Sequence, residues 1–447
     1  MLCCILISLA VLANANLTIE LTRNEKDFLE FRRAKNNGVP LDPEHPKVIE
    51  IEDIKKFWLN RPSLCVGVTN SWMTEYTTTV KIGSNQQEMQ VILGVGSRHL
   101  WVPKKKCIGC PTQNFFDSSN SSTFYNKYYE MNIYYEHGKV FGDLSLDEVR
   151  LGNPESHSFK TEIMIAREAQ DLEGMVADGV LGIIPPKKGD GDSFSTYLIK
   201  NSIIDSKDIT VFLGDGEDHS YAEFGSNKEN TEEVTWVRSG IDYDFGITNN
   251  NVSFSYMNKT IPISTHCIAF DTESAVSGIP RIDLKTIIST LQQGKTLLYY
   301  EEYDFFGVKC ASLDEFYDLQ ITFKEHISYI AVEDYILYIH GHCLFKFYDS
   351  GNENNVIILG NSFLRGTKFT KINAERKIGL WPQKLRHSPR IYEGYSYLWI
   401  YLLLIFLGIS FAASGIYFYK RASHQKGDIS EESEMAGGNE DRNFNFY

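Results

Sequence analysis

Short apolar runs separated by polar turns fill most of this chain. Examples are VKIGS, MQVIL, KVFGDLSLDEVRLG and ITVFL, which are rich in β-branched and aromatic residues. Runs of this length and pattern are typical of β strands. Helical patterns occur at residues 24–34, 194–201 and 282–293. The chain is therefore predicted to be an all-β, sandwich-like protein with few helices.

Two stretches of the chain repeat the same pattern. Residues 91–103 (VILGVGSRHLWVP) and 267–280 (CIAFDTESAVSGIP) each contain an apolar strand, a tight turn and a hydroxyl residue. Gly94 in the first stretch corresponds to Asp271 in the second. An apolar pair and a glycine follow 88 residues after Gly94 and 89 residues after Asp271. Matched motifs at a matched interval indicate a duplicated unit. We therefore predict two similar lobes, each of which contributes one loop to a shared cleft.

These motifs resemble those of the pepsin-like aspartic proteases. The resemblance runs from about residue 76 to 382, and IGSNQQEMQVIL, LWVP, FFDSSNSSTF, ADGVLGI and IILGNSFLRG also carry it. It implies a bilobal pepsin-like fold, with two pseudo-symmetric β lobes and a central cleft that takes a polypeptide. In this family each lobe carries an Asp-Thr-Gly-Thr/Ser loop. The two aspartates share one proton, because two carboxylates so close together cannot both ionise.

The resemblance also shows where this chain departs from the family. Asp271 matches the second-lobe aspartate, whereas Gly94 occupies the position of the first. Val95 replaces the first-lobe threonine, Thr272 keeps its second-lobe counterpart, and Glu273 stands where the family has glycine. One carboxylate cannot both activate water and protonate the leaving amine. We therefore expect a catalytically inactive protein. The alternative is that Glu273 replaces the missing acid, although a side chain from the same loop as Asp271 is expected to have the wrong geometry.

The residues around the two loops follow the family more closely. Ser97 and Ser274 match the hydroxyls that hydrogen-bond the two aspartates. Residues 132–142 (NIYYEHGKVFG) resemble the hairpin, called the flap, that covers the cleft. Tyr135 matches the flap tyrosine and Trp101 matches the tryptophan that supports it. The resemblance thus places Ser97, Tyr135, Thr272, Glu273 and Ser274 in the substrate cleft.

Eight cysteines are present, and the resemblance assigns four of them. It implies one disulfide between Cys310 and Cys343 and another between Cys107 and Cys110, the second shortened to a Cys-x-x-Cys loop. Adjacent lysines make Cys-x-x-Cys look like a redox site, but no thioredoxin-like βαβ pattern surrounds it. The pairing of Cys65 and Cys267 is open.

We expect no metal, no cofactor and no nucleic-acid partner. The stretch His340-Gly-His342-Cys343 looks like a set of metal ligands, but the disulfide interpretation uses Cys343. The formal charge of −14 opposes binding to phosphate backbones, which requires a basic surface.

The two ends of the chain predict its location. Residues 1–15 are apolar and end in Ala-Asn-Ala, as in a cleavable signal peptide. Residues 398–419 carry no charge and are long enough to span a bilayer. We therefore expect a single-pass type I protein of the secretory pathway or cell surface, whose ectodomain is lumenal or extracellular. Glycosylation sequons begin at Asn16, Asn120, Asn251 and Asn258.

These features divide the chain into seven segments. The segments are a signal peptide (1–15), a propeptide-like extension (16–69), an N-terminal lobe (70–226), a C-terminal lobe (227–386), a stalk (387–397), a transmembrane helix (398–419) and a cytosolic tail (420–447). Three functions are consistent with this organisation. The first is a pseudoprotease whose cleft binds polypeptide. The second is an active aspartic endopeptidase in which Asp271 has an unusual partner. The third is a receptor or structural ectodomain.

Overall fold

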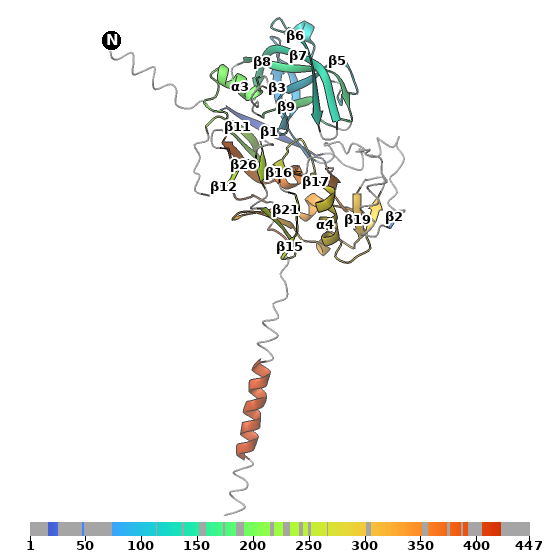
Figure 1. Cartoon of the computed structure of the whole chain (residues 1–447), viewed down its shortest axis with the longest axis vertical. Helices are drawn as coiled ribbons and strands as arrows, with labels where there is room; N and C mark the ends of the chain where they lie inside the picture. The colour runs from blue at the N-terminus through green and yellow to red at the C-terminus, as the bar shows by residue number, and fades with distance from the viewer. Residues whose placement is uncertain are drawn as a thin grey trace, which may run out of the picture. The chain divides into compact units, whose positions relative to one another are not determined.

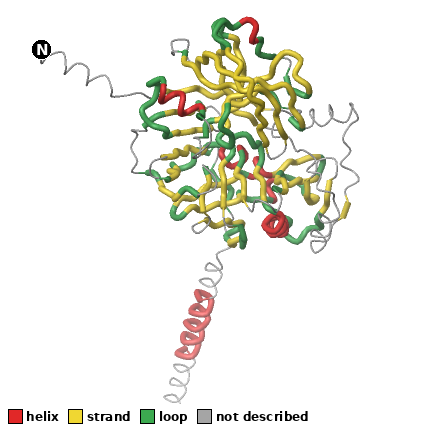
Figure 2. The backbone as a smooth tube through the Cα atoms, turned by 45° about the horizontal axis from the view of Figure 1, so that its top comes forward, coloured by secondary structure: helices red, strands yellow, loops and turns green. Residues whose placement is uncertain are grey.

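The computed structural model describes most of the central part of the chain. The described residues are 17–25, 47–48, 74–112, 114–135, 138–151, 158–172, 175–184, 192–214, 219–226, 233–240, 245–248, 252–265, 267–300, 305–350, 356–372, 376–385, 388–391 and 405–421. They belong to two compact units, residues 1–392 and 393–447. Strands dominate the first unit, as predicted (Figures 1 and 2).

The largest sheet of the first unit has 13 strands. In spatial order they are β12 (Thr235–Arg238), β27 (Lys377–Leu380), β26 (Thr367–Ile372), β10 (Ile209–Leu213), β11 (Ser220–Phe224), β1 (Leu17–Glu25), β3 (Thr74–Ile82), β4 (Gln87–Gly94), β9 (Gly179–Gly182), β5 (Leu100–Ile108), β8 (Phe159–Gln170), β7 (Gly138–Leu151) and β6 (Tyr125–Tyr135).

Three smaller sheets lie in the later part of the same unit. The first contains β13 (Gly246–Thr248), β16 (Cys267–Phe270), β25 (Val356–Leu359), β17 (Ser277–Ile279) and β24 (Phe347–Asp349). The second contains β15 (Lys259–Ile261), β14 (Val252–Tyr256), β20 (Leu319–Phe323) and β21 (His326–Ile330). The third contains β2 (Lys47–Val48), β18 (Leu298–Tyr300), β19 (Phe305–Lys309), β23 (His342–Phe345) and β22 (Ile336–Ile339).

Short helices connect these strands. They are α3 (Phe194–Lys200), α4 (Arg281–Leu291), α5 (Val332–Tyr335) and α6 (Asn361–Leu364), with 3-10 turns at η2 (Ser118–Asn120) and η4 (Leu313–Glu315). The helices predicted at 194–201 and 282–293 are confirmed. Ser193 caps α3 by accepting a hydrogen bond from the N–H of Thr196, as expected for a serine at this position.

The duplication predicted from the spacing of the motifs appears in the strand pairing. Strand β4 runs parallel to β9 and ends with Gly94 opposite Gly182, while β5 pairs antiparallel with β9. Strand β16 runs parallel to β25 in the same way, and β17 pairs antiparallel with β25. A Cβ on Gly182 would lie 2.6 Å from the backbone nitrogen of Arg98, and one on Gly360 would lie 2.6 Å from the carbonyl oxygen of Ser274. Both positions require glycine because another backbone passes so close.

The first described strand, β1, is part of the folded core. It pairs with β11 through residues 17–21 and with β3 through residues 22–25. Ile19 is 0% exposed and Leu21 is 7% exposed. Asn24 lies within β1, so the helix predicted over 24–34 does not begin there. The rest of that predicted helix lies outside the described residues.

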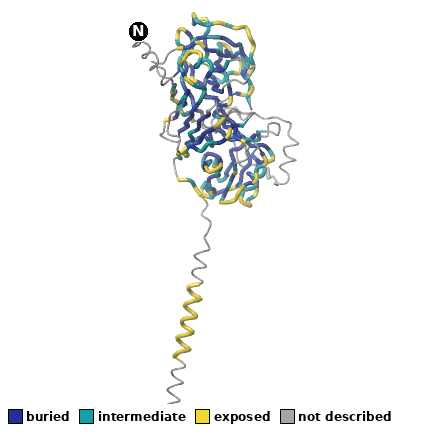
Figure 3. Tube along the Cα trace, turned by 60° about the vertical axis from the view of Figure 1, so that its left-hand side comes forward, coloured by how far each residue is buried: buried dark blue, intermediate teal, exposed yellow. Residues whose placement is uncertain are grey.

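In the second unit, residues 405–421 are helical and their side chains are exposed (Figure 3). No helix in the described ranges combines the length and apolar character needed to cross a membrane. Residues 398–404 of the predicted span lie outside the described part of the chain, as do the predicted signal peptide and nearly all of the cytosolic tail.

Candidate active site

The two duplicated loops are joined by the side chain of Thr272. Its hydroxyl accepts a hydrogen bond of 3.1 Å from the backbone N–H of Val95. The same hydroxyl donates to the carbonyl oxygen of Leu93. Thr272 is 1% exposed, so both bonds are sheltered from water and breaking them leaves buried polar groups unpaired. Val95 has no hydroxyl with which to make the reciprocal contact.

The side chain of Glu273 occupies the place where a side chain at position 94 would lie. A Cβ built on Gly94 would overlap Oε1 of Glu273 and would lie 2.8 Å from its Cδ. Such a Cβ would also lie 2.8 Å from the hydroxyl oxygen of Ser97. The glutamate therefore reaches from the second loop to the first, and Gly94 leaves the space that it fills.

Asp271 and Glu273 present their carboxylates to the same spot beside Gly96. The position of a Cβ on Gly96 is 3.1 Å from Oδ1 of Asp271 and 3.5 Å from Oε1 of Glu273. Asp271 also accepts a hydrogen bond of 2.8 Å from the N–H of Glu273, which orients its carboxylate. Asp271 is half-buried, whereas Glu273 is only 6% exposed.

Burial raises the pKa of both carboxyl groups. It is the main cause that raises the pKa of Asp271, against hydrogen bonds from Glu273 and Ser274 that lower it. Burial, and then the charge of Asp271, raise the pKa of Glu273 to about 8. The Ser97 hydroxyl and the N–H groups of Gly96 and Ser97 pull that pKa down less strongly. Oε1 of Glu273 itself has no hydrogen bond of standard geometry to the described residues, which agrees with a preference for the neutral form.

The tyrosine that matches the flap tyrosine, Tyr135, lies close to this pair of acids. The indole N–H of Trp101 donates a hydrogen bond of 2.6 Å to the hydroxyl of Tyr135. Burial, and then the charge of Glu273, raise the pKa of Tyr135 well above its usual range. Asp271 acts on Tyr135 in the same direction, and the Ser97 hydroxyl acts in the opposite one. Tyr135 is therefore a neutral hydroxyl close to both carboxyl groups.

Comparison with known proteins shows the family of the chain. A family model described as eukaryotic aspartyl protease matches residues 75–380. The chain belongs to the eukaryotic aspartyl protease family. Vacuolar protease A of Arthroderma otae is 26% identical over 67% of this chain and 75% of its own length. Pepsin A of Gallus gallus is 25% identical over 70% and 86%, and Pepsin A of Sus scrofa is 26% identical over 85% and 98%.

The structure of this aspartyl protease homologue brings together the site residues that the sequence predicts. Asp271, Thr272, Glu273 and Ser274 lie on one loop, and they meet Ser97 from the other loop and Tyr135 from the flap. Although Glu273 shares a loop with Asp271, its side chain reaches the first loop beside Gly94 and Gly96. Glutamate has one more methylene than aspartate, and the glycines at 94 and 96 leave room for it to cross to the first loop.

Asn361 is a supporting residue that the sequence analysis did not single out. Its side-chain amide donates a hydrogen bond of 3.1 Å to the carbonyl oxygen of Thr272. Its backbone N–H donates one of 2.7 Å to the carbonyl oxygen of Ser274. These two hydrogen bonds fix the backbone of the loop that carries Asp271. Its place directly after the apolar-apolar-Gly motif was the signal that pointed to it.

The two predicted disulfides are confirmed. Cys107–Cys110 and Cys310–Cys343 are both bonded. The second removes Cys343 from any metal site, and His342 instead contacts the hydroxyl of Tyr300 through Nδ1. Cys65 lies outside the described residues, so the pairing of Cys65 and Cys267 stays open. Asn120 and Asn258 of the sequons are exposed; Asn16 and Asn251 lie outside the described residues.

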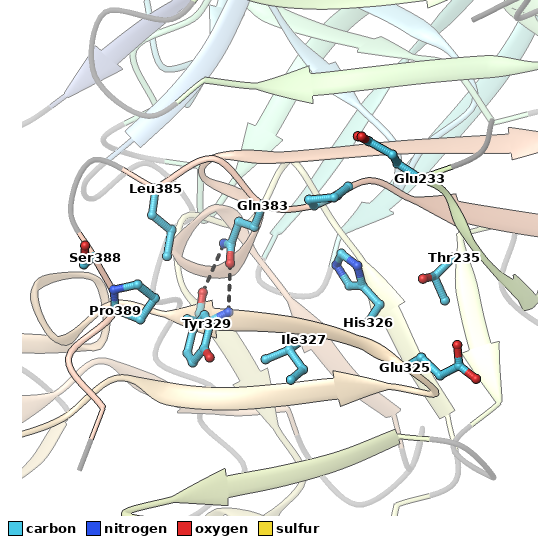
Figure 4. A pocket seen from close by; sticks show the side chains of 11 residues that line it. Glu233, Thr235, Glu325, His326, Ile327, Tyr329, Gln383, Leu385, Ser388 and Pro389 are labelled. Atoms are coloured by element: carbon cyan, nitrogen blue, oxygen red, sulfur yellow. Dashed lines mark hydrogen bonds between the residues drawn. The ribbon is translucent and has the colours of Figure 1, made fainter. Parts of the chain in front are cut away.

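A separate groove of about 750 Å³ lies beside β21, and neither Asp271 nor Glu273 lines it. Figure 4 shows Gln383 at its side, paired with the backbone of Tyr329. The Gln383 amide accepts a hydrogen bond of 2.8 Å from the Tyr329 N–H and donates one of 3.1 Å to its carbonyl oxygen. The same amide donates to the carbonyl oxygens of Phe363 and Arg365. Gln383 thereby fixes the chain that leaves the folded unit against the edge of β21.

Proposed function

We propose that this aspartyl protease homologue binds extended polypeptide in the cleft between its two loops and the flap. One observation carries the proposal: Tyr135, held by Trp101, lies close to two carboxyl groups on a loop that Thr272 joins to the first loop. A substrate lying across this site would meet a neutral hydroxyl on one side and an acid pair on the other. The names of the relatives, Vacuolar protease A and Pepsin A, support polypeptide as the ligand class.

Binding is tested with a peptide-like inhibitor in which a secondary hydroxyl replaces the peptide bond that would be cleaved. The full-length protein in detergent should show a higher melting temperature with this compound, because a ligand that binds only the folded state stabilises it. A peptide of the same composition in scrambled order is the control compound. If the inhibitor neither raises the melting temperature nor competes with any peptide, a receptor or structural ectodomain becomes the better interpretation.

Two interpretations of the catalytic activity of this site follow from its residues. A non-catalytic pseudoprotease is favoured by Gly94, which supplies no carboxylate, and by Val95, which supplies no hydroxyl. An active endopeptidase is favoured by the position of Glu273 beside Asp271. We favour the second, because two carboxyl groups, those of Asp271 and Glu273, lie beside Gly96 where the family pattern led us to expect one.

We propose in addition that the protein is anchored by residues 398–419, with its cleft in the lumen or outside the cell. The uncharged stretch supports the anchor, and the predicted signal peptide supports its orientation, since basic residues lie on both sides of the stretch. The test is protease protection of a C-terminal tag in sealed microsomes. Digestion of the tag from the cytosolic side is expected, and its protection would overturn the type I assignment.

A further inference from the structure

We propose that Glu273 is the second catalytic carboxylate of this protein, and that it works with Asp271 to hydrolyse peptide bonds. The inference deepens the proposed function, since it requires that the cleft binds polypeptide. It reassigns the first-lobe acid to a residue of the second-lobe loop. A residue-by-residue match to the family does not reveal this transfer, because it shows Gly94 only as a missing aspartate and Glu273 only as a missing glycine.

Positions 94 and 273 differ from the family pattern in opposite ways. By the resemblance, Gly94 stands where the family has an aspartate, and Glu273 stands where the family has a glycine. The structure explains why the two belong together. With Glu273 in place, even an alanine at position 94 would overlap Oε1 of Glu273. With glycine at 94, the carboxylate of Glu273 occupies the space that the side chain would have filled.

The environment of the Glu273 carboxylate supports the same assignment. Ser97 matches the first-lobe hydroxyl that serves the aspartate of its own loop. Here the Ser97 hydroxyl oxygen and Oε1 of Glu273 lie near the same point, because a Cβ on Gly94 would be 2.8 Å from the first and would overlap the second. That hydroxyl and the N–H groups of Gly96 and Ser97 lower the pKa of Glu273, although less than burial raises it. The first-loop groups that match the partners of an aspartate thus face a carboxylate of the second loop.

The two acids have different surroundings. Asp271 is half-buried and receives hydrogen bonds from Glu273 and Ser274, which favour its ionised form. Glu273 is more deeply buried and faces the negative charge of Asp271, which favours its protonated form. Two titratable groups act with Glu273: Asp271 on its own loop, and Tyr135 on the flap, which stays neutral. The hydrogen bond from the Glu273 N–H to Asp271 and the deeper burial of Glu273 thus favour Asp271 as the base and Glu273 as the acid of the pair.

The reaction needs only water as co-reactant. Asp271 takes a proton from water while the water oxygen bonds to the carbonyl carbon of the peptide, and Glu273 gives its proton to the carbonyl oxygen. In the second step Asp271 gives its proton to the amide nitrogen as the C–N bond breaks. A hydroxyl of the tetrahedral intermediate returns a proton to Glu273. One acid and one amine are released, and both carboxyl groups end in their starting states.

The experiment measures cleavage of a diverse peptide library by the full-length protein between pH 3 and pH 9. Wild-type protein, Glu273→Gln, Asp271→Asn and the surface control Glu325→Gln are compared. Wild type and Glu325→Gln should cleave equally. Glu273→Gln and Asp271→Asn should each lower kcat by about 10²- to 10⁴-fold with little change in KM, as expected for loss of a general acid or base. Wild-type activity should fall above pH 8, where Glu273 loses its proton.

A relocation experiment separates catalysis from a structural role. Glu273→Gly removes the carboxylate, and adding Gly94→Asp to that variant returns one from the first loop. The double variant should recover at least 10-fold in kcat over Glu273→Gly alone. Gly94→Asp in the wild-type background should not raise activity, because its side chain would collide with Glu273.

The outcomes distinguish the two proposals. Unchanged kcat in Glu273→Gln, or an inhibitor-stabilised wild-type protein that cleaves no peptide at any pH, would overturn the role of Glu273 and leave polypeptide binding standing. A wild-type protein that neither cleaves nor responds to the inhibitor would refute the proposed function, and the role of Glu273 with it. Loss of kcat in Glu273→Gln together with recovery in the relocated variant supports both.

Discussion

Glu273→Gln replaces a buried carboxyl group by a neutral amide of almost the same size. In the folded protein the pKa of this carboxyl is raised from 4.5 to about 8. Folded protein therefore holds the Glu273 proton more tightly than unfolded protein does. Stability from this group is fully present below about pH 4.5 and is lost as the pH rises towards 8. The glutamine variant cannot lose that proton, so it should not show this loss.

The size of the effect follows from the shift. Each unit of pKa corresponds to 1.36 kcal/mol, so a rise from 4.5 to about 8 corresponds to roughly 5 kcal/mol. Part of this free energy comes from the interaction between Glu273 and Asp271 and is shared by the two residues, since the pKa of Asp271 is also raised. We therefore expect Glu273→Gln to be about 3–5 kcal/mol more stable than wild type above pH 8, and nearly equal to it at pH 4.

The assay is chemical denaturation followed by tryptophan fluorescence at pH 4, 6 and 8, with Glu325→Gln as control. Residue 325 is exposed, so its substitution should leave the pH dependence unchanged. The free energy of unfolding of wild type should decline with pH relative to Glu273→Gln. If the free energy of unfolding changes with pH in the same way in both proteins, Glu273 has an ordinary pKa. That result would refute the claim that Glu273 lies buried beside Asp271.

Three further substitutions test the contacts around the site. Gly94→Ala should destabilise the protein by about 1–3 kcal/mol through overpacking, because the new Cβ overlaps Oε1 of Glu273; thermal melts should show the loss disappearing in a Glu273→Gly background. Thr272→Val should cost about 1–3 kcal/mol, since it leaves the Val95 N–H and the Leu93 carbonyl without their partner; unchanged denaturation would exclude this bridge. Gln383→Ala should cost about 1–3 kcal/mol and speed amide hydrogen exchange at Tyr329. Gln383→Glu should keep the hydrogen bond from the Tyr329 N–H and therefore the slow exchange. Equal exchange rates in the two variants would contradict a hydrogen bond between Gln383 and the Tyr329 N–H.

Much of the strand-rich fold could be predicted from the sequence. The interval between Gly94 and Gly182 matched that between Asp271 and Gly360, and the strand pairing shows the same arrangement in both halves. Such repeats are visible in sequence because the close backbone approach demands glycine at fixed places. The cystine pairs also followed from the resemblance.

The direction of the Glu273 side chain could not be predicted in the same way. A match by position treats residue 94 and residue 273 as two separate changes. It contains no information about which space a side chain from one loop fills beside the other loop. The contact exists because an absent Cβ on one loop admits a longer side chain from the other. The pairing of β1 with both β11 and β3 was also missed, since the pattern at residues 24–34 was interpreted as helical.

The most direct test of the central claim is peptide hydrolysis by wild type and Glu273→Gln, measured side by side near pH 6. At this pH, below its pKa of about 8, Glu273 holds its proton. We predict measurable cleavage by wild type and a loss of about 10²- to 10⁴-fold in kcat in the variant, with the inhibitor still binding to both. Equal kcat in the two proteins, or no cleavage by a wild-type protein that binds the inhibitor, would contradict the claim that Glu273 replaces the missing acid.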